Sequence, residues 1–253
     1  MSIKIEGQLK DDIINGRVVL FLGAGVSQTA GLKGAVQLTN YLFDMAGKPT
    51  EYASYKNDLM RLVAKFDRDP LYTRKWLNAK LIDYFLDSKN YGNLNYHEKL
   101  FHLNWAALFT TNYDICLELA EQRVQSKNFR LLPLADPKEV LLINNLDQGK
   151  LKYFKIHGCC KELESHPTTA APLVLTQRDY QESISRNKPF LEEFKRLAYD
   201  CSVIFIGFQA QKIENNYIFG ALNDVYLSLS NLIGLTSDVN SGHQIFHAAS
   251  CPA

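Results

Sequence analysis

Four short apolar runs stand out along the chain, and each ends abruptly at a small or polar group. The runs and their endings are Val18–Leu22 before Gly23-Ala24-Gly25, Trp105–Phe109 before Thr110-Thr111-Asn112, Leu151–Ile156 before His157-Gly158, and Val203–Ile206 before Gly207. Runs of this length, rich in Val, Leu, Ile and Phe, predict strands that are buried on both faces, as in a parallel sheet.

Helical patterns separate these runs. Apolar spacing predicts helices within 3–15, 26–45, 115–125 and 215–229, and two more that follow Thr176 and Pro189. Further candidate strands are 129–134, 140–143 and 173–175. The block from about 46 to 104 is too long for a simple crossover, so it predicts an inserted helical subdomain. The chain therefore belongs to the α/β class.

The four strand endings predict a ligand site. Ligands of an open parallel sheet bind beyond the carboxyl ends of its strands. If the four strands are neighbours, their endings line one crevice, and the loop at Gly23 and Gly25 allows the close backbone approach that a phosphate needs. A Gly-X-Gly sequence after a strand can also be ordinary turn chemistry, and this alternative stays open for the loop taken alone.

The composition disfavours nucleic acids and membranes as partners of this protein. The chain has 253 residues, of which 46% are hydrophobic and 22% are charged, with a net charge of +1. This charge provides no field that would recruit nucleic acid or an anionic membrane. No apolar run approaches the roughly 20 residues of a membrane helix, and residues 1–10 lack a signal-peptide core. Five unpatterned cysteines suit reduced thiols, so we expect a cytoplasmic protein.

Two common nucleotide-binding classes are disfavoured. A hydride-transferring dehydrogenase has Gly-X-Gly-X-X-Gly with an acidic residue about 20 residues later. Here the third glycine is Gly31, which lies too far along the chain. The Gly-Lys-Ser/Thr sequence of a kinase-type phosphate loop is missing as well.

Three segments carry a resemblance to a known family. Gly23–Ser27, Thr110–Asp114 and Lys155–Gly158 resemble the sirtuin (silent information regulator) fold, and most closely the sirtuin-like domains of bacterial antiphage defence proteins. The likeness spans about residues 12 to 225. It implies a Rossmann-like parallel sheet flanked by helices with a helical insertion, and cleavage of the nicotinamide–ribose bond of NAD. We therefore expect an NAD-binding domain over 1–235.

The resemblance also implies roles for individual residues. Asn112 and His157 are the candidate catalytic residues, with Asn112 holding a water or the ribose and His157 titrating near neutral pH as a general base. Asp114 is expected to receive the nicotinamide amide. The candidate residues for binding NAD are Gly23, Ala24, Gly25, Ser27, Thr111, Asp114 and Gly207.

Each candidate also has a structural interpretation. Asn112 could cap the following helix, and Asp114 could complement the dipole of its first turn. His157 could be a turn histidine with a satisfied ring, and Gly207 could simply end a strand.

The departures from the family pattern bear on activity. The deacetylases of the family carry two Cys-X-X-Cys pairs for zinc, whereas this chain has only adjacent Cys159-Cys160 after His157. Their Pro-Asp-Phe-Arg stretch is replaced by residues 32–35. Gln209 stands where the defence relatives usually have Ser, and Lys33 and Ala35 stand where Pro and Trp are frequent. A catalytically inert module that binds NAD or ADP-ribose, or a scaffold, therefore stays open, whereas a protein deacylase is disfavoured.

The expected function is an NAD hydrolase that depletes NAD once a trigger is sensed. Because unregulated cleavage would destroy the host's own NAD, we expect a homo-oligomer or a partner defence protein such as an ATPase or an Argonaute-like protein. The segment 236–253 shows no periodicity and is expected to be an irregular tail. Its His243, His247 and Cys251 could bind a metal on a helix, but bracketing Gly and Pro disfavour that helix, so we predict no metal.

Overall fold

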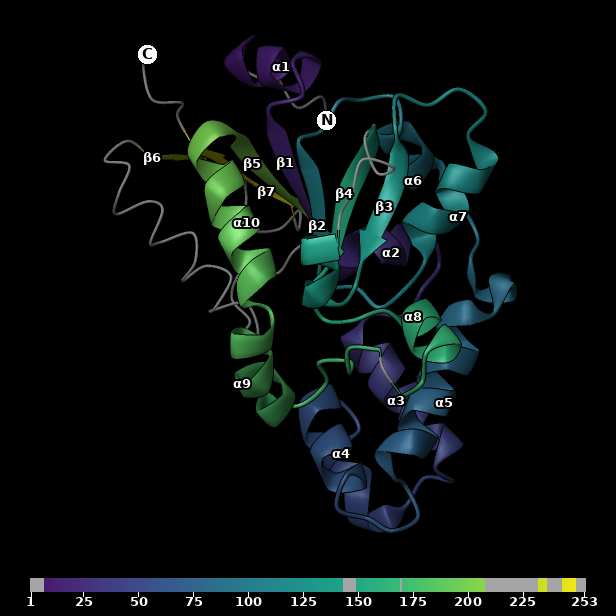
Figure 1. Ribbon diagram of the computed structural model, residues 1–253. Coiled ribbons are helices and arrows are strands. Elements are labelled where there is room, and N and C mark those ends of the chain that lie inside the picture. Colours follow the sequence, from purple (N-terminus) through teal and green to yellow (C-terminus); the bar gives the residue numbers. More distant parts are fainter. Residues whose placement is uncertain (1–6, 143–148, 169, 208–231, 236–242, 249–253) are drawn as a thin grey trace.

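A seven-stranded sheet forms the centre of the protein in a computed structural model that describes residues 7–142, 149–168, 170–207, 232–235 and 243–248. The strand order is β3-β4-β2-β1-β5-β7-β6 (Figure 1). Five strands are parallel to one another: β3 (Arg130–Leu134), β4 (Lys150–Lys155), β2 (Ala107–Thr110), β1 (Val18–Leu22) and β5 (Ser202–Ile206). The predicted α/β fold with a parallel sheet is confirmed.

The four strands with distinctive endings are direct neighbours in the order β4-β2-β1-β5. Leu22 pairs with both Thr110 and Ile206, and Thr110 pairs with Lys155. Because these pairs are the last or nearly the last residues of parallel strands, the four endings emerge at one edge of the sheet. The predicted convergence of the strand endings is therefore confirmed.

Strand β1 is buried along its whole length because both faces of the sheet are covered. Alternate residues enter two separate apolar clusters: Leu20 packs on one side, and Phe21 packs on the other. On the Phe21 side, aromatic rings from four strands stack beneath Phe190 and Phe194 of α10 (Lys188–Asp200), which crosses this face in Figure 1. The apolar runs are thus core strands.

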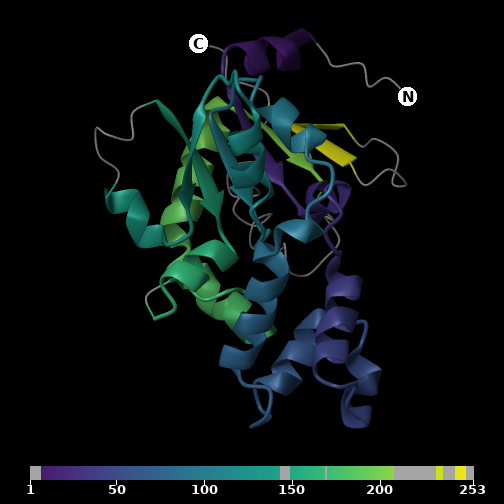
Figure 2. The ribbon, with the colours of Figure 1, turned by 90° about the vertical axis from the view of Figure 1, so that its right-hand side faces the viewer.

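The helices outside the insertion are α1 (Gly7–Ile14), α2 (Ala24–Thr29), α3 (Ala35–Met45), α7 (Cys116–Arg123), α8 (Cys160–Ser165), α9 (Gln177–Arg186) and α10. The insertion between α3 and β2 contains η1 (Thr50–Tyr55), α4 (Leu59–Phe66), α5 (Arg74–Leu86), η2 (Ser88–Asn90) and α6 (Asn95–Leu100). Figures 1 and 2 show α4 and α5 in a helical lobe beneath the sheet, whereas α6 lies at the level of the sheet, beside α7.

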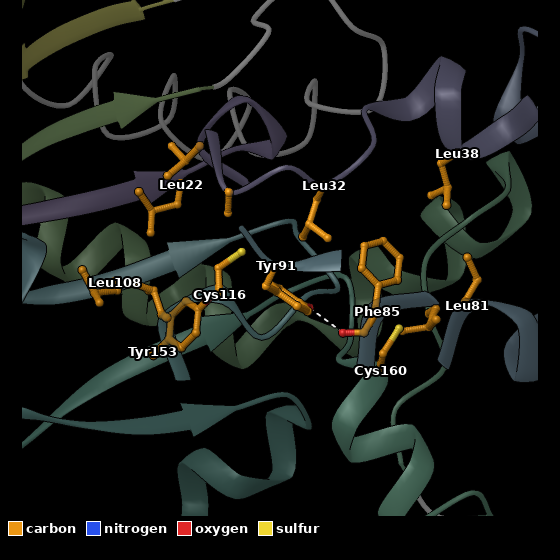
Figure 3. Close-up of a cluster of buried hydrophobic side chains, with 14 of the residues drawn as sticks. Leu22, Leu32, Leu38, Leu81, Phe85, Tyr91, Leu108, Cys116, Tyr153 and Cys160 are labelled. Carbon is orange, nitrogen blue, oxygen red and sulfur yellow. Dashed lines mark hydrogen bonds between the residues drawn. The ribbon is translucent and has the colours of Figure 1, made fainter. Parts of the chain in front are cut away.

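A continuous core joins the insertion to the sheet. Figure 3 shows Phe85 and Leu81 of α5 packed near Leu38 of α3 and Leu32, in the same cluster as Leu22 at the end of β1. The hydroxyl of Tyr91 donates a buried hydrogen bond to the carbonyl of Phe85 in this cluster. Because apolar burial is the main favourable term in folding, this shared core fixes the lobe against the site edge of the sheet.

Three local predictions were wrong. The helix expected over 26–45 is two helices, α2 and α3, because Gly31 adopts a left-handed φ of +94° between them. The candidate strand at 140–143 begins instead as the 3-10 helix η3 (Pro137–Leu142). Residues 173–175 belong to no helix or strand.

The prediction that residues 236–253 form an irregular tail was wrong in part, because this segment contains a strand. β7 (His243–Ala248) pairs antiparallel with β5, with Ile245 opposite Ile204, and β6 (Leu232–Leu235) pairs with β7. The edge of β5 offers backbone N–H and C=O groups, and an added strand satisfies them. The helix expected at 215–229, Gln209 and Cys251 lie outside the described residues.

Candidate functional site

A cavity of about 580 Å³ lies where the carboxyl ends of β1, β2 and β4 face the helical insertion. Six of the predicted site residues line it: Ala24, Ser27, Thr111, Asn112, Asp114 and His157. Sequence reasoning missed the opposite wall, which includes Leu32, Lys33, Val36, Leu59, Met60 and Phe85. The apolar periodicity of these segments resembles that of ordinary core helices, so only their placement against the sheet edge identifies them as cavity residues.

The turn after β2 is held by Thr110, which is fully buried. Its Oγ1 donates a 2.8 Å hydrogen bond to the carbonyl of Leu22 on β1 and accepts one of 3.0 Å from the backbone N–H of Asn112. Thr110 therefore couples the end of β1 to the placement of Asn112. In the sequence, the signal for this role of Thr110 was its position directly after the apolar run Trp105–Phe109.

Asn112 is anchored through its side-chain nitrogen. Nδ2 donates to the carbonyl of Gly23 at 3.1 Å and to Oγ of Ser27 at 2.8 Å. Both amide protons are thus used, which leaves Oδ1 as the atom that can accept a hydrogen bond from a water or hydroxyl in the cavity. Asn112 does not cap α7, whose N-cap residue is Ile115.

Ser27 and Asp114 continue this network inward. Oγ of Ser27 donates a 2.7 Å hydrogen bond to Oδ2 of Asp114, and Oδ1 of Asp114 accepts one of 2.9 Å from the backbone N–H of Cys116. Asp114 lines the cavity and also stabilises the start of α7, so both of its interpretations have structural support. The hydroxyl proton of Ser27, a candidate residue for binding NAD, points to Asp114 and is not directed at a ligand.

A buried ion pair supports the turn that carries Asp114. Nζ of Lys155, at the end of β4, contacts Oε1 of Glu118 at 2.8 Å and donates to the backbone carbonyl of Asp114. Burial alone would lower the pKa of Lys155, but the charge of Glu118 and its other neighbours raise that pKa well above its ordinary value. Lys155 therefore remains a cation that fixes the Asp114 turn, a role that sequence reasoning missed.

His157 lies in a closed aromatic environment. It is 2% exposed, its ring meets that of Tyr180 edge-on at 5.0 Å between centroids, and the ring of Tyr113 lies 6.5 Å away. The turn that follows β4 requires Gly158, whose φ is +86°. The strand therefore delivers the imidazole directly to the cavity wall.

The expectation that His157 titrates near neutral pH was wrong. Burial, together with the charge of Arg186, lowers its pKa to about 3. Desolvation disfavours the cationic form of an imidazole, so the ring is neutral throughout the physiological range. A neutral imidazole can accept a hydrogen bond from a substrate hydroxyl, although it is a weak base in this state.

The glycine loop packs against the end of β5. The N–H of Gly23 donates to the carbonyl of Ile206 at 2.8 Å, and that of Gly25 donates to the carbonyl of Gly207 at 2.9 Å. A Cβ atom on Gly25 would lie 2.8 Å from Cα of Gly207. Gly23, Gly25 and Gly207 do not line the cavity; they shape the loop that brings Ala24 and Ser27 to it.

The described residues contain no group of three or more His, Cys, Asp or Glu side chains that could hold a metal ion. Cys159 and Cys160 are buried free thiols. The prediction that no metal is bound stays a prediction. Among the helices between residues 7 and 207 that the structure describes, none is long and apolar enough to cross a membrane.

Comparison with known proteins gives one match. No individual curated protein matches the sequence. Residues 106–228 match the family model of the SIR2-like domain, a span that contains Asn112, Asp114 and His157 but not the Gly23 loop, which the fold places beside them. Over this span the chain is similar to a SIR2-like domain, and the parallel sheet agrees with that likeness.

Proposed function

We propose that the protein is an NAD glycohydrolase, which cleaves the nicotinamide–ribose bond to give nicotinamide and ADP-ribose. The observation that carries this proposal is the convergence of Asn112 and His157 on one cavity from the ends of two different strands. Both side chains are held rigidly, the first through Ser27 and the second by aromatic rings.

The chemistry requires little acid catalysis. Breaking an N-glycosidic bond passes through an oxocarbenium-like transition state, and water must then reach the anomeric carbon. Oδ1 of Asn112 would orient that water or a ribose hydroxyl, and the neutral ring of His157 would accept a hydrogen bond from the hydroxyl. The carboxylate of Asp114 would accept from the nicotinamide amide. Nicotinamide leaves as a neutral molecule, so no strong acid is needed.

The remaining predicted contacts belong to the rest of the dinucleotide. Ala24 and Thr111 line the cavity at the sheet edge, where the ribose and the first phosphate would lie. Gly23, Gly25 and Gly207 would act by shaping the loop that approaches the pyrophosphate: Gly25 and Gly207 pack too closely for a side chain, and the carbonyl of Gly23 accepts from Asn112.

A second candidate is a module that binds NAD or ADP-ribose without turnover. Lys33 favours it: its Nζ lies 4.8 Å from the centroid of the Tyr84 ring, and the residue lines the cavity. A fixed cation there would attract a phosphate group of the dinucleotide whether or not cleavage follows. A protein deacylase is less well supported because the zinc-binding cysteine pairs are missing from the sequence.

We further propose that the activity serves bacterial antiphage defence by NAD depletion in the cytoplasm. Such an enzyme must stay silent until it is triggered, so the proposal includes a homo-oligomer or a partner protein, for example an ATPase or an Argonaute-like protein. The support for this role is the sequence resemblance together with the cost of unregulated NAD loss to the host.

Nicotinamide release separates the two candidates. The purified chain is incubated with NAD, with and without candidate triggers, and nicotinamide is quantified by chromatography. The hydrolase predicts release that Asn112→Ala abolishes. The inert module predicts tight ADP-ribose binding by calorimetry and no release under any trigger, a result that would overturn the hydrolase proposal.

A further inference from the structure

The first turn of α5 carries an arginine that helix energetics do not explain. Arg74 is the first residue of α5, after the N-cap Thr73. A cation at a helix N-terminus opposes the helix dipole, so this position disfavours Arg for helix stability alone. The side chain of Arg74 instead turns to two carboxylates outside the helix.

Arg74 makes a bidentate contact with each of these two carboxylates, Asp67 and Asp179. Nε and Nη2 contact the two oxygens of Asp67 at 3.0 and 2.5 Å, and Nη1 and Nη2 contact those of Asp179 at 3.0 and 3.2 Å. Arg74 is 32% exposed, Asp67 28% and Asp179 17%. Bidentate contacts of this kind set orientation as well as energy, and lysine cannot reproduce them.

Asp179 connects this cluster to the cavity wall. Its Oδ2 accepts hydrogen bonds of 2.9 Å from the backbone N–H groups of both Leu175 and Thr176, and it completes the capping box of α9. Leu175 lines the cavity, and so does Tyr180 in the first turns of the same helix. α9 lies below α10, next to the insertion (Figure 1).

Residues 174–180, which Asp179 holds in place, form the part of the cavity wall that covers His157. Tyr180 packs edge-on against the ring of His157, and the backbone N–H of Val174 donates to the carbonyl of His157 at 3.1 Å. The hydroxyl of Tyr113 also donates to the carbonyl of Val174, which ties the wall to the turn that carries Asn112. The contact of Arg74 with Asp179 therefore joins the insertion to the residues that shield the imidazole.

We infer that Arg74 is a positioning residue for the site: by clamping Asp179 to the insertion, it holds the 174–180 wall and its Tyr180 against His157. Arg74 contacts none of the proposed reacting groups, so its effect passes through the wall. The inference rests on the proposed function only for its kinetic consequence, because its structural consequence at His157 can be measured in a protein of any activity.

The test compares Arg74→Gln with Arg178→Gln. Arg178 also lies on α9, but its side chain is 85% exposed and its Nε donates to Glu182 rather than to Asp179. Arg74→Gln is expected to lower kcat/KM for nicotinamide release about tenfold, mainly through kcat, whereas Arg178→Gln should leave it unchanged. Arg74→Lys should not restore the activity. Asp67→Asn, which spares the capping box, should act in the same direction as Arg74→Gln.

A second measurement does not depend on activity: the His157 ring is titrated by proton NMR between pH 8 and 4.5. The His157 signal is assigned as the one that is missing from the spectrum of His157→Gln. The charged group that lowers its pKa is Arg186 on α9, and its aromatic neighbours are Tyr113 and Tyr180. In the wild type the midpoint, at about 3, lies below this pH range. A loosened wall admits water, so Arg74→Gln should bring the titration midpoint of His157 into this range.

Two results would overturn the inference: an unchanged His157 titration in a folded Arg74→Gln protein, or an equal change in Arg178→Gln. Absence of nicotinamide release from the wild type would instead contradict the proposed function, and the titration would still decide the role of Arg74. Thermal unfolding of each variant establishes that it is folded before either comparison is made.

Discussion

The hydroxyl of Ser27 donates a 2.7 Å hydrogen bond to the carboxylate of Asp114, although 87 residues separate them along the chain. The same hydroxyl accepts from Nδ2 of Asn112. One small side chain on α2 thus fixes the two polar residues that follow β2. The glycine loop contributes to the site through this internal network as well as through its approach to a ligand.

Removing that hydroxyl should disturb the site more than the fold. Ser27→Ala leaves the carboxylate and the amide without their shared partner, which costs about 1–3 kcal/mol of stability for buried polar groups. We expect nicotinamide release to fall 10- to 100-fold. Thr29→Ala, on the same helix, removes only a local hydrogen bond to the carbonyl of Val26 and is the matched control. Equal activity of the two variants would refute a role for the Ser27 network.

Asn112→Ala and His157→Ala should each lower NAD cleavage by about two to four orders of magnitude, the usual contribution of a positioned acid–base group. Asn112→Asp is the sharper variant, because it keeps the shape but brings a carboxylate against the carbonyl of Gly23. We expect it to be as inactive as the alanine variant in steady-state assays. Near-native turnover in any of the three would remove that residue from the mechanism.

The depressed pKa of His157 predicts a pH dependence of stability. Its folded pKa is about 3, against about 6.5 when unfolded, so between these values the unfolded chain binds a proton that the folded protein does not. Stability from this group is full above pH 6.5 and decreases as the pH falls, by about 2 kcal/mol at pH 5. Denaturant unfolding of His157→Gln should show a shallower loss between pH 7 and 5. His97, whose pKa is also lowered by burial, contributes equally to both proteins.

The glycines at the β5 end should tolerate no side chain. A Cβ on Gly207 would lie 2.4 Å from the backbone nitrogen of Val26, and the residue has a φ of +67°. Gly207→Ala should therefore destabilise the protein by several kcal/mol, because backbone must shift in addition to the strain of the left-handed conformation. Gly47 shares the positive φ, at +78°, but has open space around it, so Gly47→Ala should cost only about 1 kcal/mol. Similar melting temperatures for the two variants would contradict the close packing.

NAD cleavage should persist when divalent metals are removed. The proposed chemistry uses Asn112, Asp114 and His157 alone, so a chelator should change neither kcat nor the melting temperature. Metal analysis of the purified chain should find no stoichiometric ion. Zinc that is lost on deleting residues 240–253 would instead establish a site at His243, His247 and Cys251.

The sequence by itself determined the architecture and the identity of the polar strand endings. Uninterrupted apolar runs can only be buried on both faces, so their burial in a parallel sheet followed from composition and length alone. The positions of Asn112 and His157 at strand ends then placed them at one edge, since parallel strands end on the same side. The β7 strand was missed because its pattern is short and its pairing depends on available partners, here β5 and β6.

Only the tertiary structure decided how these residues act. The pKa of His157 is set by Tyr180, Tyr113 and Arg186, which enclose the ring from segments distant in sequence. Likewise, the proton of Ser27 turns inward because Asp114 is brought beside it. The far wall of the cavity comes from the insertion and from residues 32–38 before it, and no local periodicity encodes their packing at the sheet edge. Desolvation and hydrogen-bond partnership are properties of neighbours in space, and the folded chain supplies those neighbours.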